Sequence, residues 1–350
     1  FPAAPVLVAK AMLAERPAAR AVVINSGQAN ACTGDEGMRN CRTTQELVAG
    51  ALGLEASDIL PASTGVIGAQ LKMDLWEKAA PALAANLGKA TPEDFARAIM
   101  TTDAFHKISH REVSLPGGVV KLVGMAKGAG MICPNMATML SVVLCDAQVE
   151  ASVWQKMLCD AVELTFNRVT VDGDTSTNDT LYGLANGASG VSASDEESLK
   201  ALSAALTSVL GDLAYMLVKD GEGASKVARI HVTGAASGAD AERVARTVGH
   251  SQLVKTALYG RDANWGRIVA AVGRSGADFN PDDVVVTLCG VELFRKGQPT
   301  DLDFDALLEE PLKQRDLPID IVLGSGSGSY TLLASDLGHE YVNVNADYRS

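Results

Sequence analysis

The stretch that most constrains this chain is residues 127–140, Lys-Gly-Ala-Gly-Met-Ile-Cys-Pro-Asn-Met-Ala-Thr-Met-Leu. It runs from a glycine-rich turn through a Pro-Asn pair into the apolar residues 139–145, which predict a buried strand. Thr138 stands at the start of that strand, and its β-branched side chain is stiff enough to be aimed at a pocket. If the bond after the small Ala137 were cut, Thr138 would become an N-terminal nucleophile whose own amine serves as base. The local sequence by itself favours the alternative, a loop entering a core strand.

The chain has 350 residues, a length that predicts two domains or one large unit with an appendage. From about residue 282 the pattern changes to short strands with one helix near 303–312, which is typical of a separate α+β unit. We therefore expect a larger domain over residues 1–250 and a smaller α+β domain over 251–350.

The net charge and the cysteine spacing limit the classes of partner and the cellular compartment that the sequence predicts. The net charge of −12 is spread along the chain, which disfavours nucleic acid and anionic membranes as partners. No apolar run approaches the roughly 20 residues of a membrane helix. The six cysteines have irregular spacings without a Cys-x-x-Cys pair, as expected for reduced thiols in the cytoplasm. Because the chain begins at Phe1 rather than at Met, targeting to an organelle stays open.

Three polar features stand outside the opening stretch. Thr64 and Gly65 end a predicted strand, where a hydroxyl and an amide N–H can donate to an oxyanion, although Thr-Gly pairs are common. Glu222 lies between glycines in the turn 220–226, where its carboxylate is either exposed or held at a site. Residues 339–345 predict a strand before a polar end, which indicates a docked C-terminus.

Three sequence patterns partly match those of metal or phosphate sites. His106 and His110 would share one face of a helix, but no third ligand accompanies them. Residues 167–180 are acidic like a calcium loop, yet Gly183 stands where the closing glutamate belongs, so a hydrogen-bonded structural loop is expected. The glycine-serine run 324–329 lacks the lysine of a phosphate loop. The sequence therefore predicts neither a metal nor a cofactor.

Motifs spread over nearly the whole chain resemble the ornithine acetyltransferase family of arginine biosynthesis, also called the glutamate N-acetyltransferase family. They stand in the family's order, and the long stretch at 127–140 is highly specific. Cys133 and the region after 324 depart from the common family pattern, away from the predicted catalytic groups. The matching segments are residues 25–34, 63–68, 127–140, 171–179, 220–226, 262–267 and 345–350.

The resemblance implies a precursor that cuts itself between Ala137 and Thr138, giving an α chain of residues 1–137 and a β chain of residues 138–350, with two of each in the assembly. Thr138 would take the acetyl group from N2-acetylornithine, release ornithine and pass the acetyl group to glutamate in a ping-pong cycle. N-acetylglutamate would be the second product. Acetyl-CoA is a further donor in some members of the family, and for this chain that question stays open.

The resemblance also implies roles for individual residues. Thr64 and Gly65 would form the oxyanion hole, and Glu222 would orient the Thr138 amine or bind a substrate ammonium. The substrate-binding residues would be Thr64, Lys127, Thr138, Glu222, Asn345 and Ser350. The implied fold is an α/β (α+β) helix–sheet–sheet–helix sandwich, similar to N-terminal-nucleophile hydrolases but with different connectivity, plus a smaller α+β C-terminal domain.

Other functions remain as alternatives. An amidase or aminopeptidase-type hydrolase would use water in place of glutamate, and an acyltransferase of an antibiotic pathway would use another acceptor with the same nucleophile. A non-catalytic amino-acid-binding protein would not be cleaved at all. The matching Lys127, Glu222, Asn345 and Ser350 favour transfer between amino acids.

Overall fold

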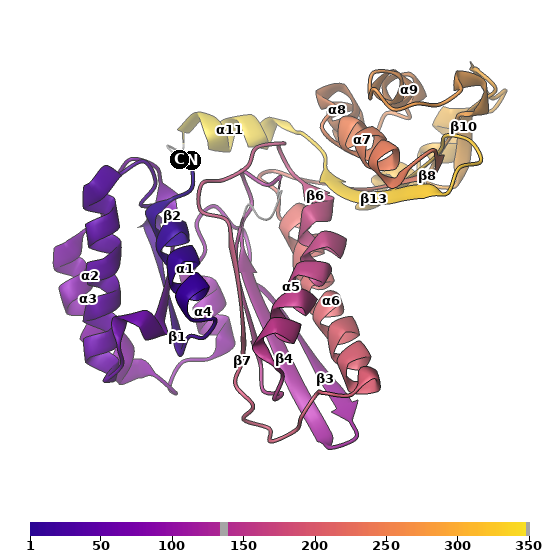
Figure 1. Cartoon of the computed structure of the whole chain (residues 1–350). Coiled ribbons are helices and arrows are strands. Elements are labelled where there is room, and N and C mark those ends of the chain that lie inside the picture. The colour runs from indigo at the N-terminus through magenta and orange to yellow at the C-terminus, as the bar shows by residue number, and fades with distance from the viewer. Residues whose placement is uncertain (134–138, 348–350) are drawn as a thin grey trace.

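The computed structural model describes residues 1–133 and 139–347, which form a mixed α/β structure with three sheets (Figure 1). This confirms the predicted α/β class. The first sheet is the parallel pair β1 (Ala21–Gln28) and β2 (Ile59–Val66). The second has the order β3 (Lys107–Leu115), β4 (Gly118–Lys127), β5 (Leu140–Cys145) and β7 (Thr180–Ala185).

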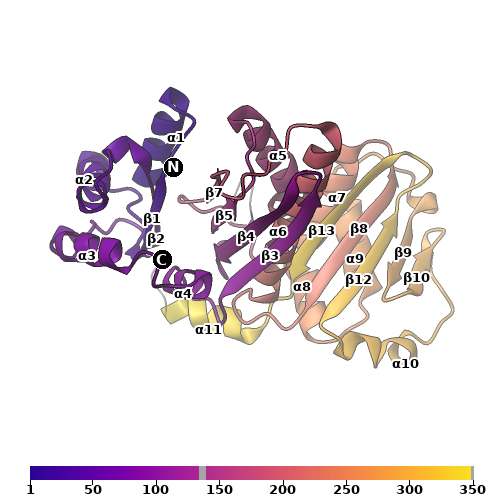
Figure 2. The same cartoon turned by 90° about the horizontal axis from the view of Figure 1, so that it is seen from below.

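These two sheets face each other between two layers of helices (Figure 2). Val23 and Ile59 turn from the first sheet towards α2 (Gly34–Leu52) and α3 (Met73–Asn86). Leu60 of the same sheet packs instead against Leu140 and Tyr182 of the second sheet. The far side of the second sheet packs on α5 (Ala151–Leu164) and α6 (Glu196–Lys219). The result is the expected helix–sheet–sheet–helix sandwich.

Helix α6 packs against α5 and against β3 and β4 of the second sheet. Asp195 caps its first turn by accepting a hydrogen bond from the Ser198 N–H. Gly124 of β4 lets it approach closely, because a Cβ there would lie 2.6 Å from Val209. Contrary to the sequence expectation, α6 is long and apolar enough to cross a membrane by length and composition. Its inward face explains that composition, since five leucines at helical spacing are fully buried in the core: Leu202, Leu206, Leu210, Leu213 and Leu217.

The third sheet has seven strands in the order β11-β10-β9-β12-β8-β13-β6. Strand β8 (Val227–Ala235) lies before the predicted domain boundary at residue 250, yet it pairs with β12 and β13, which follow that boundary. The other strands are β6 (Val169–Thr170), β9 (Val285–Leu288), β10 (Val291–Arg295), β11 (Gln298–Pro299), β12 (Asp316–Val322) and β13 (Gly328–Ser335). The helices of this region are α7 (Gly238–Gly249), α8 (Gln252–Tyr259), α9 (Trp265–Gly273) and α10 (Phe304–Leu308).

The structure corrects two local predictions. Residues 339–345 belong to a helix, α11 (His339–Asp347), rather than to a strand. None of the residues of α11 is buried, so its sequence has no apolar face at helical spacing. The apolar residues Val342 and Val344 instead alternate with polar residues, a pattern that is typical of a strand. His106 precedes β3 and His110 lies within it, so the two share no helix face. Over residues 1–133 and 139–347, no group of three potential metal ligands is found.

The sequence predicts no counterpart for α1 (Ala4–Glu15), α8, β7 and the two-residue strands β6 and β11. Thr91 caps the short helix α4 (Pro92–Ala98) through a reciprocal pair of hydrogen bonds with Asp94.

Candidate functional site

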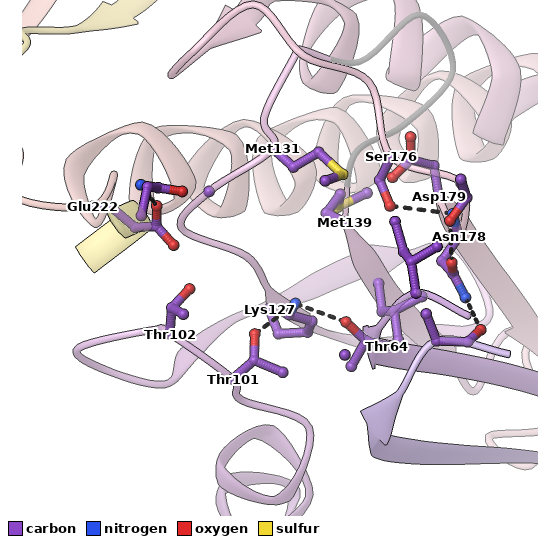
Figure 3. A pocket seen from close by; sticks show the side chains of 17 residues that line it. Thr64, Thr101, Thr102, Lys127, Met131, Met139, Ser176, Asn178, Asp179 and Glu222 are labelled. Atoms are coloured by element: carbon purple, nitrogen blue, oxygen red, sulfur yellow. Dashed lines mark hydrogen bonds between the residues drawn. The ribbon is translucent and has the colours of Figure 1, made fainter. Parts of the chain in front are cut away.

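Most of the predicted site residues line one pocket, which lies between the two sheets of the sandwich and the end of α11 (Figure 3). Thr64, Gly65, Lys127, Glu222 and Asn345 all contribute to its wall. They come from β2, the end of β4, the turn after α6, and α11, which extends from the third sheet back to the sandwich (Figure 1). The predictions for Ala137, Thr138 and Ser350 lie outside the described residues. Met139, the residue that follows Thr138, lines the pocket.

The Thr64-Gly65 corner depends on a close approach of two strands. In the parallel β1–β2 pair, Gly27 lies opposite Gly65, and a Cβ on Gly65 would be 2.3 Å from the Gly27 carbonyl carbon. Gly65 also has φ of +125°, a conformation that favours glycine. Thr64 Oγ1 accepts a hydrogen bond of 3.0 Å from Lys127 Nζ, which leaves the hydroxyl proton to donate into the pocket. This corner can therefore stabilise a developing oxyanion.

Lys127 is the cation of the pocket. It ends β4 opposite Leu140, the first residue of β5, and its Nζ donates to Thr64 Oγ1 and Thr101 Oγ1 at 3.0 Å each. Burial lowers the pKa of Lys127, and the negative charges of Asp103 and then Glu222 act against that shift. An ammonium group has three protons, so one remains for a ligand carboxylate.

Glu222 is one of two carboxylates that line the pocket, and it lies in the turn that follows α6. Its N–H donates to the Ala129 carbonyl at 3.1 Å, and its Oε2 accepts from Asn345 Nδ2 at 2.6 Å. A Cβ on Gly130 would lie 2.5 Å from both carboxylate oxygens of Glu222, so the bare glycine makes room for them. The carboxylate is thereby held at the wall and can bind an ammonium group.

Sequence reasoning missed part of the wall. Thr101 and Thr102 line the pocket between α4 and β3, and no sequence signal marked them. The residues 176–179 also line it, although the polar composition of their loop was interpreted as purely structural. Asn178 explains both roles, because its Nδ2 donates to the carbonyls of Ala29 at 2.5 Å and Ser63 at 2.8 Å. The loop thus fastens β2 while it faces the pocket.

The lining has the chemistry of an amino-acid site. A buried ammonium, the two carboxylates of Asp179 and Glu222, several hydroxyls and two amides suit a zwitterion that carries one further charge or amide. The Thr64-Gly65 corner adds the donor pair that acyl transfer requires.

Comparisons with known proteins agree on one family. A family model described as "ArgJ family" matches residues 1–350. The arginine biosynthesis bifunctional protein ArgJ of Nitratidesulfovibrio vulgaris is 72% identical over 100% of this chain and 89% of the relative. The same-named protein of Geobacter sulfurreducens is 46% identical over 95% of this chain and 85% of the relative. A crystal structure of this bifunctional protein from Bacillus halodurans matches with a TM-score of 0.58 and 37% identity, covering 60% of this chain and 100% of the other.

Proposed function

Because the chain belongs to the ArgJ family of acetyl-transferring enzymes of arginine biosynthesis, we propose that Thr138 is the nucleophile of that transfer. The chain is an N-acetyltransferase that moves the acetyl group from N2-acetylornithine to glutamate, releasing ornithine and N-acetylglutamate. The relatives are named bifunctional proteins, which indicates a second activity. We propose that this second activity uses acetyl-CoA as the acetyl donor.

The chemistry proceeds in two matched halves. The Thr138 amine takes the hydroxyl proton while Oγ attacks the acetyl carbonyl carbon, and the resulting oxyanion accepts hydrogen bonds from Thr64 and Gly65. The C–N bond then breaks, the departing ornithine nitrogen receives the proton, and the acetyl group stays on Oγ as an ester. In the second half, the glutamate amine attacks this ester and Thr138 regains its proton.

One observation carries the proposal. Thr64, Gly65, Lys127 and Glu222 line the same pocket as Met139, the residue directly after Thr138. Lys127 suits the α-carboxylate shared by both substrates, and Glu222 with Asn345 suits an ammonium group. Ser350 is proposed as a further substrate contact.

The proposal includes self-cleavage between Ala137 and Thr138, since a free amine on Thr138 requires it. Residues 138–350 make up 213 of 350 residues, or 61%, close to the 60% of this chain that covers the whole Bacillus halodurans chain. We further propose an assembly of two α chains (residues 1–137) and two β chains (residues 138–350), and a location in the cytoplasm.

A Thr138→Ala variant tests the cleavage. The wild-type protein should give two bands of roughly 14 and 22 kDa on a denaturing gel, and Thr138→Ala a single uncut band. Thr138→Ser is the control, because it keeps a hydroxyl and should still be cleaved. An alanine variant that splits like the wild type would refute Thr138 as nucleophile.

The transfer itself is tested by following ornithine release from N-acetylornithine with and without glutamate. Sustained release should depend on glutamate, because without an acceptor the acetyl-enzyme accumulates after one turnover. Equal turnover without glutamate would indicate the hydrolase alternative.

A further inference from the structure

Three charged side chains are buried next to the pocket without lining it. Lys107 Nζ donates to Asp103 Oδ1 at 2.7 Å and to Asp220 Oδ2 at 2.5 Å. The side chains of Lys107 and Asp103 are 0% exposed and that of Asp220 is 2% exposed. Replacing such a buried ion cluster by apolar residues is often neutral or stabilising in proteins, so its presence calls for a role beyond stability.

Asp103 holds Lys127 in place through hydrogen bonds to Gly128 and Thr101. Its carboxylate accepts from the Gly128 N–H at 2.6 Å, which fixes the backbone just after Lys127. It also accepts from the Thr101 N–H at 3.0 Å, and the Thr101 hydroxyl in turn accepts from Lys127 Nζ. The Asp103 carboxylate thus fixes the backbone next to Lys127 and, through Thr101, the position of the Lys127 ammonium group.

Asp220 extends the same cluster to Glu222. Its carboxylate accepts from the Ala104 N–H at 3.2 Å, which joins the turn after α6 to the segment that carries Thr101. Two residues further on, the Glu222 N–H donates to the carbonyl of Ala129, which follows Lys127 and Gly128 in the chain. The segments 101–104, 127–130 and 220–222 therefore form a closed ring of contacts around Lys107.

From this ring we propose that Asp103, held in its ion cluster with Lys107 and Asp220, is a positioning residue that fixes Lys127 and Glu222 at the separation that the two ends of an amino-acid substrate require. The inference rests on the proposed function, because it assumes that Lys127 and Glu222 bind substrate.

The charges around Lys127 give the ring a second effect. Asp103, Glu222 and Asp179 present negative charge to its ammonium group, whereas Lys107 presents positive charge. Two carboxylates against one ammonium leave the Asp103–Lys107–Asp220 cluster with one net negative charge. Within this cluster the Asp103 carboxylate raises the pKa of Lys127 and so acts against the lowering by burial.

Two variants test the proposal. Thr101→Val removes only the hydroxyl that holds Lys127, so it leaves every buried charge in place, and kcat/KM for N-acetylornithine should fall roughly tenfold. Asp103→Asn removes the negative charge that raises the pKa of Lys127 most, so the alkaline limb of the pH–activity profile should move to lower pH. Asp58→Asn is the matched control, since Asp58 is a buried carboxylate that accepts from a backbone N–H and from Arg16 outside the pocket wall. It should leave the pH profile unchanged.

The titration of Lys127 is followed in parallel by NMR of lysine labelled at Cε, with its signal assigned through Lys127→Met. Folded Thr101→Val and Asp103→Asn proteins with wild-type kcat/KM, pH profile and Lys127 titration would overturn the proposal. If Asp103→Asn does not fold, Thr101→Val decides alone. A wild-type protein that releases no ornithine would count against the proposed function, and the Lys127 titration would still decide the positioning role.

Discussion

At the scale of single residues, the pocket depends on missing side chains as much as on charged ones. Gly130 has no positive φ, so an alanine there meets no backbone strain. The obstacle to a Cβ is the Glu222 carboxylate, the flexible end of a long side chain. Gly65 differs, because a Cβ there would meet the Gly27 backbone, which cannot move aside without separating β1 from β2.

Gly130→Ala should therefore fold normally and lose substrate affinity. The methyl group displaces the Glu222 carboxylate from Asn345, and the loss of one charge-assisted hydrogen bond should lower kcat/KM for N-acetylornithine roughly 10- to 100-fold. Steady-state kinetics and thermal unfolding measure the two effects separately.

Gly50→Ala is the matched control for this prediction. Gly50 is exposed in α2 with nothing within 4 Å of a Cβ, so alanine there should raise helix stability by about 0.5–1 kcal/mol and leave kinetics unchanged. Wild-type kinetics in Gly130→Ala would show that Glu222 does not depend on the space at Gly130.

At the scale of elements, the sequence predicts what local patterns encode. The apolar residues on one face of the segment 196–219 indicate the helix α6, and the Pro-Gly-Gly turn at 116–118 indicates the β3–β4 hairpin. Helix α11 escaped prediction because it buries no residue of its own and is held by specific contacts at its ends. Near its start, Glu340 packs over Gly223, and near its end Asn345 donates to Glu222. Such contacts depend on the tertiary fold, so no local sequence pattern predicts them.

The same distinction applies to the pocket. Thr64, Lys127 and Glu222 stand in motifs that a family resemblance can identify. Thr101 stands in no motif, and its place in the wall follows from the way Asp103 turns the chain after α4. The sequence predicts that residues 171–180 form a polar loop, but the role of this loop depends on its contacts with the rest of the fold.

That loop contacts the chain on both sides of the segment 134–138. On one side, Asp172 accepts from the N–H groups of Met131 at 2.6 Å and Ile132 at 3.0 Å. On the other side, the Thr180 N–H donates to the Met139 carbonyl at 2.9 Å. The loop therefore holds described residues on both sides of the segment in which cleavage is proposed.

Asp172→Asn should slow self-cleavage at least tenfold, because an amide cannot accept all the N–H groups that the carboxylate accepts. The fraction of uncut chain on a denaturing gel, followed over time after synthesis, measures this. Asp174→Asn is the control, since the Asp174 side chain is exposed and only its N–H contacts Asp172. Equal cleavage rates in both variants would remove Asp172 from the cleavage machinery.

At the scale of the whole molecule, the residues before and after the proposed cut are interleaved. Strand β4 pairs with β5 from Leu122↔Cys145 to Lys127↔Leu140, so one sheet contains strands from both sides. Across the two facing sheets, the Tyr182 hydroxyl donates to the Pro61 carbonyl at 2.7 Å. A cut between Ala137 and Thr138 removes one covalent bond and none of these contacts.

We therefore expect the two pieces to stay together after cleavage. In native buffer, size-exclusion chromatography should give one species containing both chains, at about 73 kDa, twice the 36.4 kDa of the whole chain, if two copies of each chain assemble. In concentrated urea the pieces should separate, because the β4–β5 ladder and the packing between the sheets are then lost. Uncut Thr138→Ala protein is the reference, and it should elute at the native position of the wild type. Pieces that separate in native buffer would contradict the shared sheet, whereas a joint species near 36 kDa would contradict only the pairing of two α chains with two β chains.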